Sequence, residues 1–117
     1  MSYFSVMREI YISEECEHYI QQESSDRVRK KFKYLLEVIE EQKIVHTSIV
    51  EKLTNTKYYE LKIKADNQIR VIIFTIDKEN FNEANEIILL NGFLKRTKKD
   101  YQKAIKIADK LLSKYEL

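Results

Sequence analysis

The sequence predicts one α+β domain, in which an N-terminal strand and a helical hairpin precede a largely antiparallel three-stranded meander and a C-terminal helix. Three observations lead to this class. The 117 residues are enough for a single domain with its own core. Apolar residues recur at helical spacing near both ends of the chain. Between these ends, consecutive apolar segments follow one another with no helix between them, as in an antiparallel sheet.

The composition indicates a folded protein of the cytoplasm. Hydrophobic residues make up 44% of the chain, and the absence of Pro together with a single Gly argues against linkers. Cys16 is the only cysteine, which excludes an internal disulfide and favours a reducing compartment. The start of the chain lacks the apolar run of a signal peptide, and no apolar run is long enough to cross a membrane. We expect residues 1–7 to form a tail and residues 8–117 to form the domain.

The N-terminal part predicts a strand followed by two helices. Residues 8–13 have the pattern of a strand, and Ser13 is then placed to cap a short helix that ends near Glu23. Residues 26–42 predict a longer helix, because apolar residues repeat at spacings of four, three and four: Val28, Phe32, Leu35 and Ile39. Residues 47–57 indicate a single helical turn packed on the core, through Ile49, Val50 and Leu53.

The C-terminal part predicts the meander and the last helix. Residues 59–65 alternate between apolar and charged side chains, whereas residues 69–76 are almost continuously apolar, as in a central strand. A turn at 66–68 joins them, and a loop at 77–85 leads to a strand at 86–90. Asp100 is placed to cap the final helix, whose buried stripe is predicted to contain Ala104, Ile107 or Ala108, Leu111 and Tyr115.

Charge is distributed unevenly along the chain. Residues 91–117 carry eight of the 21 Lys and Arg but only three of the 19 Asp and Glu, so the preceding part is acidic overall. Such polarity favours a polyanionic partner at one end of the protein. The alternative is a solvated helix face that is rich in Lys.

Strand pairing predicts a cluster of cations on the polar face of the meander. With the turn at 66–68, Lys64 lies opposite Arg70, on the face that also carries Lys62. Like charges opposed across a sheet cost up to ~1 kcal/mol, so we expect an anion to bind there and the Arg70 side chain to point to solvent. The alternative is that Glu60 and Asp66 neutralise these cations diagonally.

A second basic cluster follows the last predicted strand. Gly92 allows a bend or a close approach of another group to the backbone, and the start of the last helix adds free N–H groups for an anion. Beside the strand cations, this cluster completes a concave basic site. Its members are Lys95, Arg96, Lys98 and Lys99.

Three segments, residues 60–64, 69–71 and 91–97, together with the order of the elements, resemble the RelE superfamily of bacterial toxins. The resemblance covers roughly residues 8–115 and is closest to the phage-derived HigB-like branch. In that branch the last strand ends in His, then Gly or Ala, then Phe, before two basic residues, Thr, any residue, Lys, Thr and Pro. Asn91 stands here in place of the His, and Asp100-Tyr101 in place of the Thr-Pro.

The resemblance implies an endoribonuclease that needs no metal or cofactor, cuts mRNA on the ribosome and is silenced by a helix-turn-helix antitoxin. A ribose 2′-OH attacks the adjacent phosphate. Arg70 would hold this phosphate, Lys62 and Lys64 would stabilise the added negative charge, and Tyr101 would donate a proton or stack on a base. Nearby cations are expected to lower the pKa of such a tyrosine below ~10.

The remaining site residues follow from position in the family pattern. Lys95 and Arg96 match the catalytic cations after the last strand, and Lys99 matches the later Lys. Lys98 and Lys99 are assigned to RNA binding, as is Tyr59, which is placed to stack on a base.

Two other functions stay open. A toxin of the same fold that poisons gyrase, as in the ParE branch, would have no nuclease site, and Asn91 in place of the family's His keeps this alternative. An accessory protein would only bind RNA or a partner. His18 and His46 fall in the helical half and are assigned no role, and Cys16 is predicted to fill the core.

Overall fold

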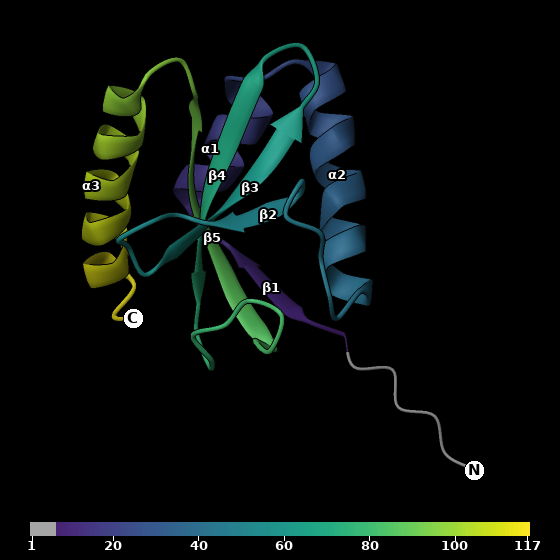
Figure 1. Cartoon of the computed structure of the whole chain (residues 1–117). Coiled ribbons are helices and arrows are strands. Elements are labelled where there is room, and N and C mark those ends of the chain that lie inside the picture. The colour runs from purple at the N-terminus through teal and green to yellow at the C-terminus, as the bar shows by residue number, and fades with distance from the viewer. Residues whose placement is uncertain (1–6) are drawn as a thin grey trace.

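The computed structural model describes residues 7–117, so residues 1–6 of the expected tail lie outside the described residues. The described chain forms five strands and three helices, which confirms the α+β class (Figure 1). In chain order these are β1 (Glu9–Ile12), α1 (Glu14–Gln22), α2 (Asp26–Glu41), β2 (Val50–Lys52), β3 (Tyr58–Lys64), β4 (Gln68–Thr75), β5 (Glu86–Leu94) and α3 (Lys98–Lys114).

The strands form one mixed sheet in the order β1-β5-β4-β3-β2. The predicted meander is confirmed, because β3 pairs antiparallel with β4, and β4 antiparallel with β5. Strand β1 joins it by pairing parallel with β5, and β2 adds an antiparallel edge beside β3. The sheet is therefore two strands wider than its central meander.

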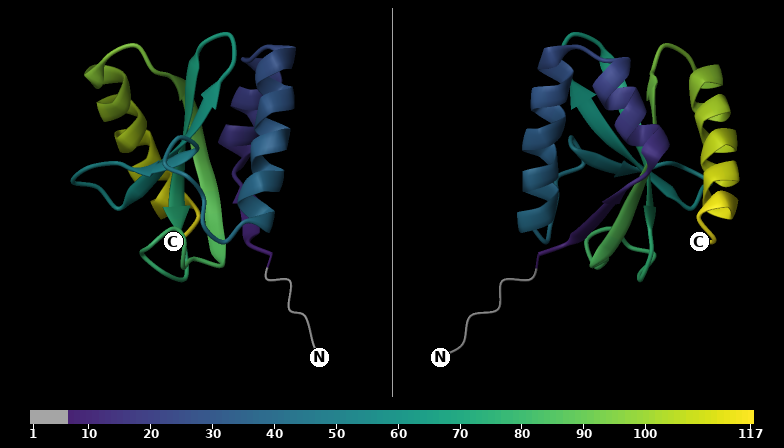
Figure 2. Two further views of the ribbon diagram at one scale, coloured as in Figure 1. Left: turned by 45° about the vertical axis from the view of Figure 1, so that its right-hand side comes forward. Right: turned by 180° about the vertical axis from the view of Figure 1, so that it is seen from behind.

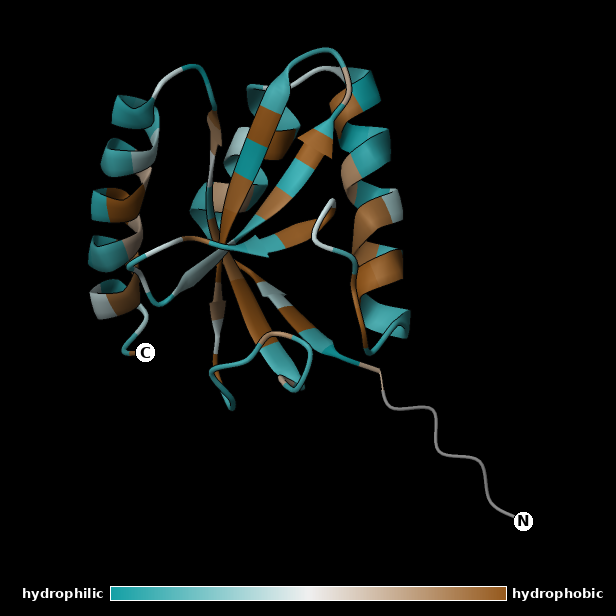
Figure 3. Ribbon diagram, viewed as in Figure 1, coloured by the Kyte–Doolittle hydropathy of each residue, from teal (hydrophilic) through white to brown (hydrophobic). Residues whose placement is uncertain are grey.

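The helices cover the two faces of the sheet unequally. Helices α1 and α2 pack on one face, and α3 packs alone on the other (Figure 2). The alternation of hydrophobic and hydrophilic residues along β3 is visible in Figure 3. Each face of the sheet nevertheless carries an apolar cluster, because β4 and β5 bury apolar residues on both sides. Between residues 7 and 117, no helix is both long and apolar enough to span a bilayer.

Two predicted elements need correction. Within 47–57 the predicted turn is found only at its start, where the backbone N–H groups of Ile49 and Val50 donate to the carbonyl of His46. The prediction missed strand β2, which follows at once, because Val50 pairs with Leu61 and extends the sheet at its edge. Strand β5 runs to Leu94, beyond the predicted end at residue 90, because pairing with β4 continues through Gly92. A run of three residues is too short for its apolar spacing to separate a strand from a helical turn.

The helix starts follow capping chemistry. The side chains of Ser13 and Ser25 accept hydrogen bonds from backbone N–H groups of α1 and α2, as predicted for Ser13. For α3 the cap is Thr97, and Asp100 lies three residues later as the second partner of a capping box, which corrects its predicted place. The buried residues of α3 are Ala104, Ala108, Leu111 and Leu112, while Ile107 is exposed and Tyr115 half-buried.

Arg8, which directly precedes β1, connects this strand to the end of α2 by hydrogen bonds. Its side chain is buried, and its guanidinium donates to the backbone carbonyls of Ala84 at 2.9 Å and Lys43 at 2.9 Å, and also to that of Ile39 in the last turn of α2. The guanidinium also lies 4.5 Å from the centre of the Phe81 ring. A cation is favourable here, because the last turn of α2 contains no basic residue and its carbonyls lack helical partners.

We predict that Arg8→Met lowers the free energy of unfolding by at least about 2 kcal/mol, because several buried carbonyls lose their donor at once. Urea unfolding followed by circular dichroism measures this loss. Lys43→Met, which removes an exposed cation at the same end, is the control and should change stability by less than about 0.5 kcal/mol. Equal stability of the two variants would show that the hydrogen bonds of Arg8 do not stabilise the end of α2.

Candidate functional site

The strand cations lie together on the face of the sheet that α3 covers. Lys62, Lys64 and Arg70 share this face, as predicted, but Arg70 pairs with Lys62, and Lys64 pairs with Gln68. The predicted pairing of Lys64 with Arg70 is therefore wrong. The turn occupies residues 65–67, one position earlier than expected, and this moves the register by two residues while leaving every side chain on its predicted face.

Arg70 is buried, which corrects the expectation that it points to solvent. Its side chain is 4% exposed, and its Nε lies 2.8 Å from the Glu60 carboxylate, itself 8% exposed. Its two terminal nitrogens donate to the backbone carbonyl of Ile69 at 3.1 Å and to the Gln68 side chain at 2.7 Å. The sequence alternative in which Glu60 neutralises Arg70 is the one found, whereas Asp66 pairs with Arg27 on α2.

Tyr101 of α3 closes the site above this ion pair. Its hydroxyl donates to Glu60 at 2.8 Å, and its ring packs edge-on against Phe93 with centroids 5.3 Å apart. Burial, followed by the hydrogen bond to Glu60, raises the pKa of Tyr101 to about 12, and Arg70 opposes this only in part. The expected lowering of its pKa by cations is therefore wrong, because burial of the phenol, together with the Glu60 carboxylate, outweighs them.

The other predicted cations surround this centre and are more exposed. Lys62 pairs with Glu51 of β2 at 2.8 Å, and this contact lowers the pKa of Glu51. Lys95 lies 5.9 Å from the centre of the Tyr101 ring, and Lys64 takes part in no ion pair between residues 7 and 117. The structure thus brings together Lys62, Lys64, Arg70, Lys95 and Tyr101.

The residues around the start of α3 point elsewhere. Arg96 pairs with Asp100 at 3.5 Å, and backbone N–H groups of residues 96 and 97 hold that carboxylate and lower its pKa. Lys98 and Lys99 are exposed in the first turn of α3. Tyr59 lies on the opposite face of the sheet, where its hydroxyl donates to the carbonyl of Glu79 at 3.2 Å, so it does not join the cluster.

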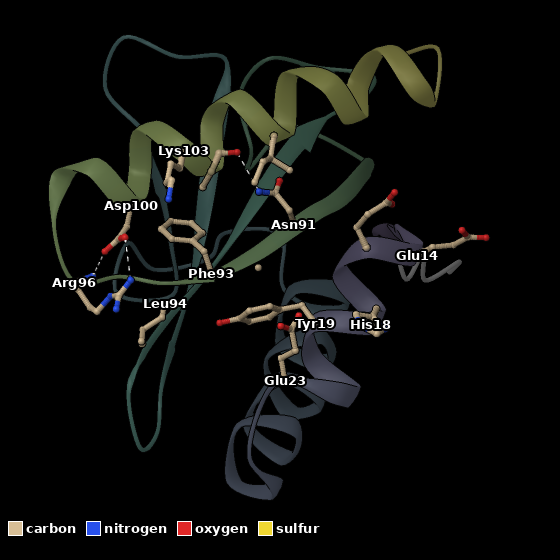
Figure 4. A pocket seen from close by; sticks show the side chains of 14 residues that line it. Glu14, His18, Tyr19, Glu23, Asn91, Phe93, Leu94, Arg96, Asp100 and Lys103 are labelled. Atoms are coloured by element: carbon tan, nitrogen blue, oxygen red, sulfur yellow. Dashed lines mark hydrogen bonds and ion pairs between the residues drawn. The ribbon is translucent and has the colours of Figure 1, made fainter.

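A groove of about 920 Å³ adjoins the site between α1 and α3 (Figure 4). Its floor is the end of β5, and Tyr19 of α1 lies so close to Gly92 that a Cβ there would meet the ring at 2.5 Å. Gly92 therefore allows the Tyr19 ring to pack directly against the backbone of β5. One wall is lined by Glu14 of α1 and by Glu23 just after it, and the other by Lys103 of α3 and by Arg96 just before it, among other residues.

The histidines and the cysteine lie outside the basic cluster. His18 lines the groove from α1, and the His46 ring contacts Ser48 at 2.8 Å. Cys16 is fully buried, and burial raises the pKa of its thiol to about 12, which confirms it as a core residue. Between residues 7 and 117, no three His, Cys, Asp or Glu side chains come together in a group that could hold a metal.

Glu60 lies at the centre of the cluster, although the sequence predicted it only as a neutralising charge. It contacts both Arg70 and Tyr101, and so connects β3, β4 and α3 at the centre of the cluster. The signal was present in the alternation of β3, which places Glu60 on the same face as Lys62. What the sequence did not reveal is that α3 covers this face and gives the carboxylate a second partner, the half-buried Tyr101, beside the buried Arg70.

Comparisons with known proteins agree with the fold described above. The family model described as phage-derived protein Gp49-like matches residues 22–113. Among solved structures, the chain is similar to a mutant of the E. coli toxin RelE in the free state, in which two arginines are replaced by alanine. The TM-score is 0.61 at 17% identity, covering 86% of this chain and 96% of that chain. The comparison with curated proteins gives no match.

We predict that Arg70→Ala destabilises the fold by about 3–5 kcal/mol, because it leaves the Glu60 carboxylate buried without its cation. The double variant Glu60→Gln with Arg70→Met removes both charges and should recover most of this loss. Arg96→Ala is the control, since its pair with Asp100 is exposed and worth at most about 1 kcal/mol. Urea denaturation compares all three, and an Arg70→Ala protein as stable as the parent would contradict the buried pair.

Proposed function

The chain belongs to the phage-derived Gp49-like family and has the fold of the RelE toxin, and on this premise we propose that it cuts mRNA on the ribosome as a metal-independent endoribonuclease. It would form a type II pair with a helix-turn-helix antitoxin in the cytoplasm. The expected membership of the RelE superfamily is confirmed by the family match and the fold. The activity itself is the proposal.

One observation carries the proposal: four cations and a protonated tyrosine converge on one face of the sheet. The chemistry needs this combination. When a ribose 2′-OH attacks the adjacent phosphate, negative charge grows on the phosphate oxygens, and fixed cations stabilise that charge more than they stabilise the substrate. Lys64 and Lys95 are exposed and can reach such a phosphate.

Tyr101 is suited to be the proton donor. Because its pKa is about 12, its phenol keeps the proton at neutral pH, and in the free protein it donates that proton to Glu60 at 2.8 Å. To act as the acid, the hydroxyl would have to turn from Glu60 to the departing oxygen once RNA is bound. The departing 5′-oxygen of the RNA needs a proton as its bond to phosphorus breaks. Tyrosine at this position therefore replaces the family's Pro with a group that can supply that proton.

Binding RNA at this site requires an exchange of partners. In the free protein Lys62 is paired with Glu51, Arg70 with Glu60 and Arg96 with Asp100. An arriving phosphate would compete with Glu51 and Asp100, which are paired with the more exposed cations. Arg70 would hold the phosphate only after its contact with Gln68 has opened, since that contact uses one of its terminal nitrogens.

The burial of Arg70 favours one alternative, a toxin of the same fold without nuclease activity. In that case the Glu60–Arg70 pair is only structural, and the protein would act on gyrase as the ParE branch does. Induced expression followed by mapping of RNA 5′ ends separates the two. We expect growth arrest, with mRNA cut within reading frames and carrying 5′-OH ends. Growth arrest with intact mRNA and damaged DNA would instead support the gyrase alternative.

We predict that Tyr101→Phe lowers the single-turnover rate of RNA cleavage by about 100-fold or more, because general acid catalysis is lost while the ring is kept. In the parent protein, the phenol should remain protonated between about pH 6 and 10, so its ionisation should impose no loss of rate there. A stopped assay of labelled mRNA on ribosomes measures both. The control is Phe93→Leu, which alters the packing against the Tyr101 ring but keeps the donor, and it should retain most activity. If the Tyr101→Phe protein cuts RNA at the parental rate, Tyr101 is not the proton donor.

A further inference from the structure

Helix α2 carries an unusually dense run of cations in its first half. Five of the seven residues from 27 to 33 are Lys or Arg, more than in any seven consecutive residues of the basic C-terminal segment. The second half of the helix, residues 34–41, contains Glu37, Glu40 and Glu41 and no basic residue. The helix is therefore strongly polarised along its own axis.

This arrangement does not stabilise the helix. Cations near the start and carboxylates near the end both oppose the helix dipole. Like charges also lie three or four residues apart, as in Arg27–Lys30, Arg27–Lys31 and Lys30–Lys33, and such pairs weaken a helix. Asp26 and Arg8 offset the charges at the two ends of α2, but the central cations have no such compensation.

Three cations and a tyrosine share one exposed stripe of α2, which we name the α2 basic face: Arg27, Lys30, Lys31 and Tyr34. Their spacings of three, four and seven residues place them side by side on the helix. Tyr34 is 56% exposed, and the Lys31 ammonium lies 5.4 Å from the centre of its ring. Lys30 and Lys31 take part in no ion pair between residues 7 and 117.

The α2 basic face lies at the same end of the molecule as the proposed catalytic cluster. Figure 1 shows the start of α2 beside the tip of the β3–β4 hairpin, with the loop that precedes α3 at the same end. In Figure 3 this part of α2 is largely hydrophilic. Asp66 in the hairpin tip accepts from Arg27 at 2.8 Å and from Ser25 at 2.8 Å, so the two surfaces are joined directly.

We propose that the α2 basic face binds the phosphate backbone of a folded RNA, separate from the strand that is cut. The proposal rests on the proposed function for the choice of RNA as the polyanion. Cations beside an exposed aromatic ring suit phosphates next to ribose or an unpaired base. Helices α2 and α3 lie on opposite faces of the sheet, so a partner that reaches both must be broader than a single strand.

An anionic membrane suits this surface less well. The apolar residues of α2 are buried against the sheet, so the helix has no apolar face to insert: Val28, Phe32, Leu35 and Ile39. The carboxylates in its second half would be repelled by a negatively charged bilayer that lies along the helix. A membrane is therefore the competing outcome of the test.

The test measures binding of a fluorescent hairpin RNA with 2′-O-methyl groups throughout, which cannot be cut by 2′-OH attack. Lys30→Gln with Lys31→Gln should weaken binding about tenfold and lower the slope of log K against log salt by about 2, one for each lost phosphate contact. The matched control is Lys43→Gln with Lys78→Gln, which removes two exposed cations at the opposite end of the molecule. The control should bind as the parent does, and both proteins should melt at or above the parental temperature.

Three results would overturn the proposal. Equal weakening by both double variants would show that only net charge matters, and parental binding by both would show that α2 makes no contact. Loss of binding to phosphatidylglycerol vesicles, with RNA binding unchanged, would assign the surface to a membrane. Because this RNA cannot be cut, the readout is independent of cleavage. RNA binding through α2 in a protein that cuts no mRNA would reject the proposed nuclease and keep this surface.

Discussion

The ion pair between Glu60 and Arg70 is the constraint on which the site depends. Two buried charges 2.8 Å apart are tolerated only while both remain paired, because an isolated charge beneath α3 would be strongly unfavourable. The Tyr101 hydroxyl donates a hydrogen bond to the Glu60 carboxylate and so connects α3 to the ion pair. The pair therefore fixes three elements relative to one another: β3, β4 and the helix that covers them. A site built on this arrangement is rigid at its centre and adaptable at its edge, where the lysines are exposed.

The same pairing of charges explains how a basic site persists in a stable fold without a bound anion. Adjacent cations repel, and Lys62 and Arg70 are directly opposed in the sheet. The carboxylates of Glu51 on β2 and Glu60 on β3 offset this repulsion, because each forms an ion pair with one of the two cations. The two carboxylates also lie opposite each other across β2 and β3. The result is an acidic pair beside a basic pair, with each cation bound to a carboxylate of the neighbouring pair. In the proposed function, an arriving phosphate would therefore have to replace a carboxylate as the partner of a cation.

The sequence predicted the faces of the strands better than their partners. Alternation along β3 has a period of two, so Lys62, Lys64 and Arg70 had to share a face wherever the turn fell. Their register depended on whether the turn began at residue 65 or 66, and no local pattern decides that. The burial of Arg70 also depended on α3, which is distant in sequence. The strand at Val50 was missed for a related reason, because only pairing with Leu61 makes this short segment a strand.

The charge of the whole chain conceals its organisation in space. A formal charge of +2 would suggest little affinity for a polyanion. In the fold, cations of α2, the β3–β4 hairpin and the start of α3 gather at one end, whereas Glu40 and Glu83 lie at the other, in the cavity next to Arg8. Asp66 joins α2 to the hairpin by bonding Arg27 and Ser25. One acidic residue thus connects two basic surfaces, so an RNA bound as proposed on the α2 basic face would lie next to the proposed cleavage site.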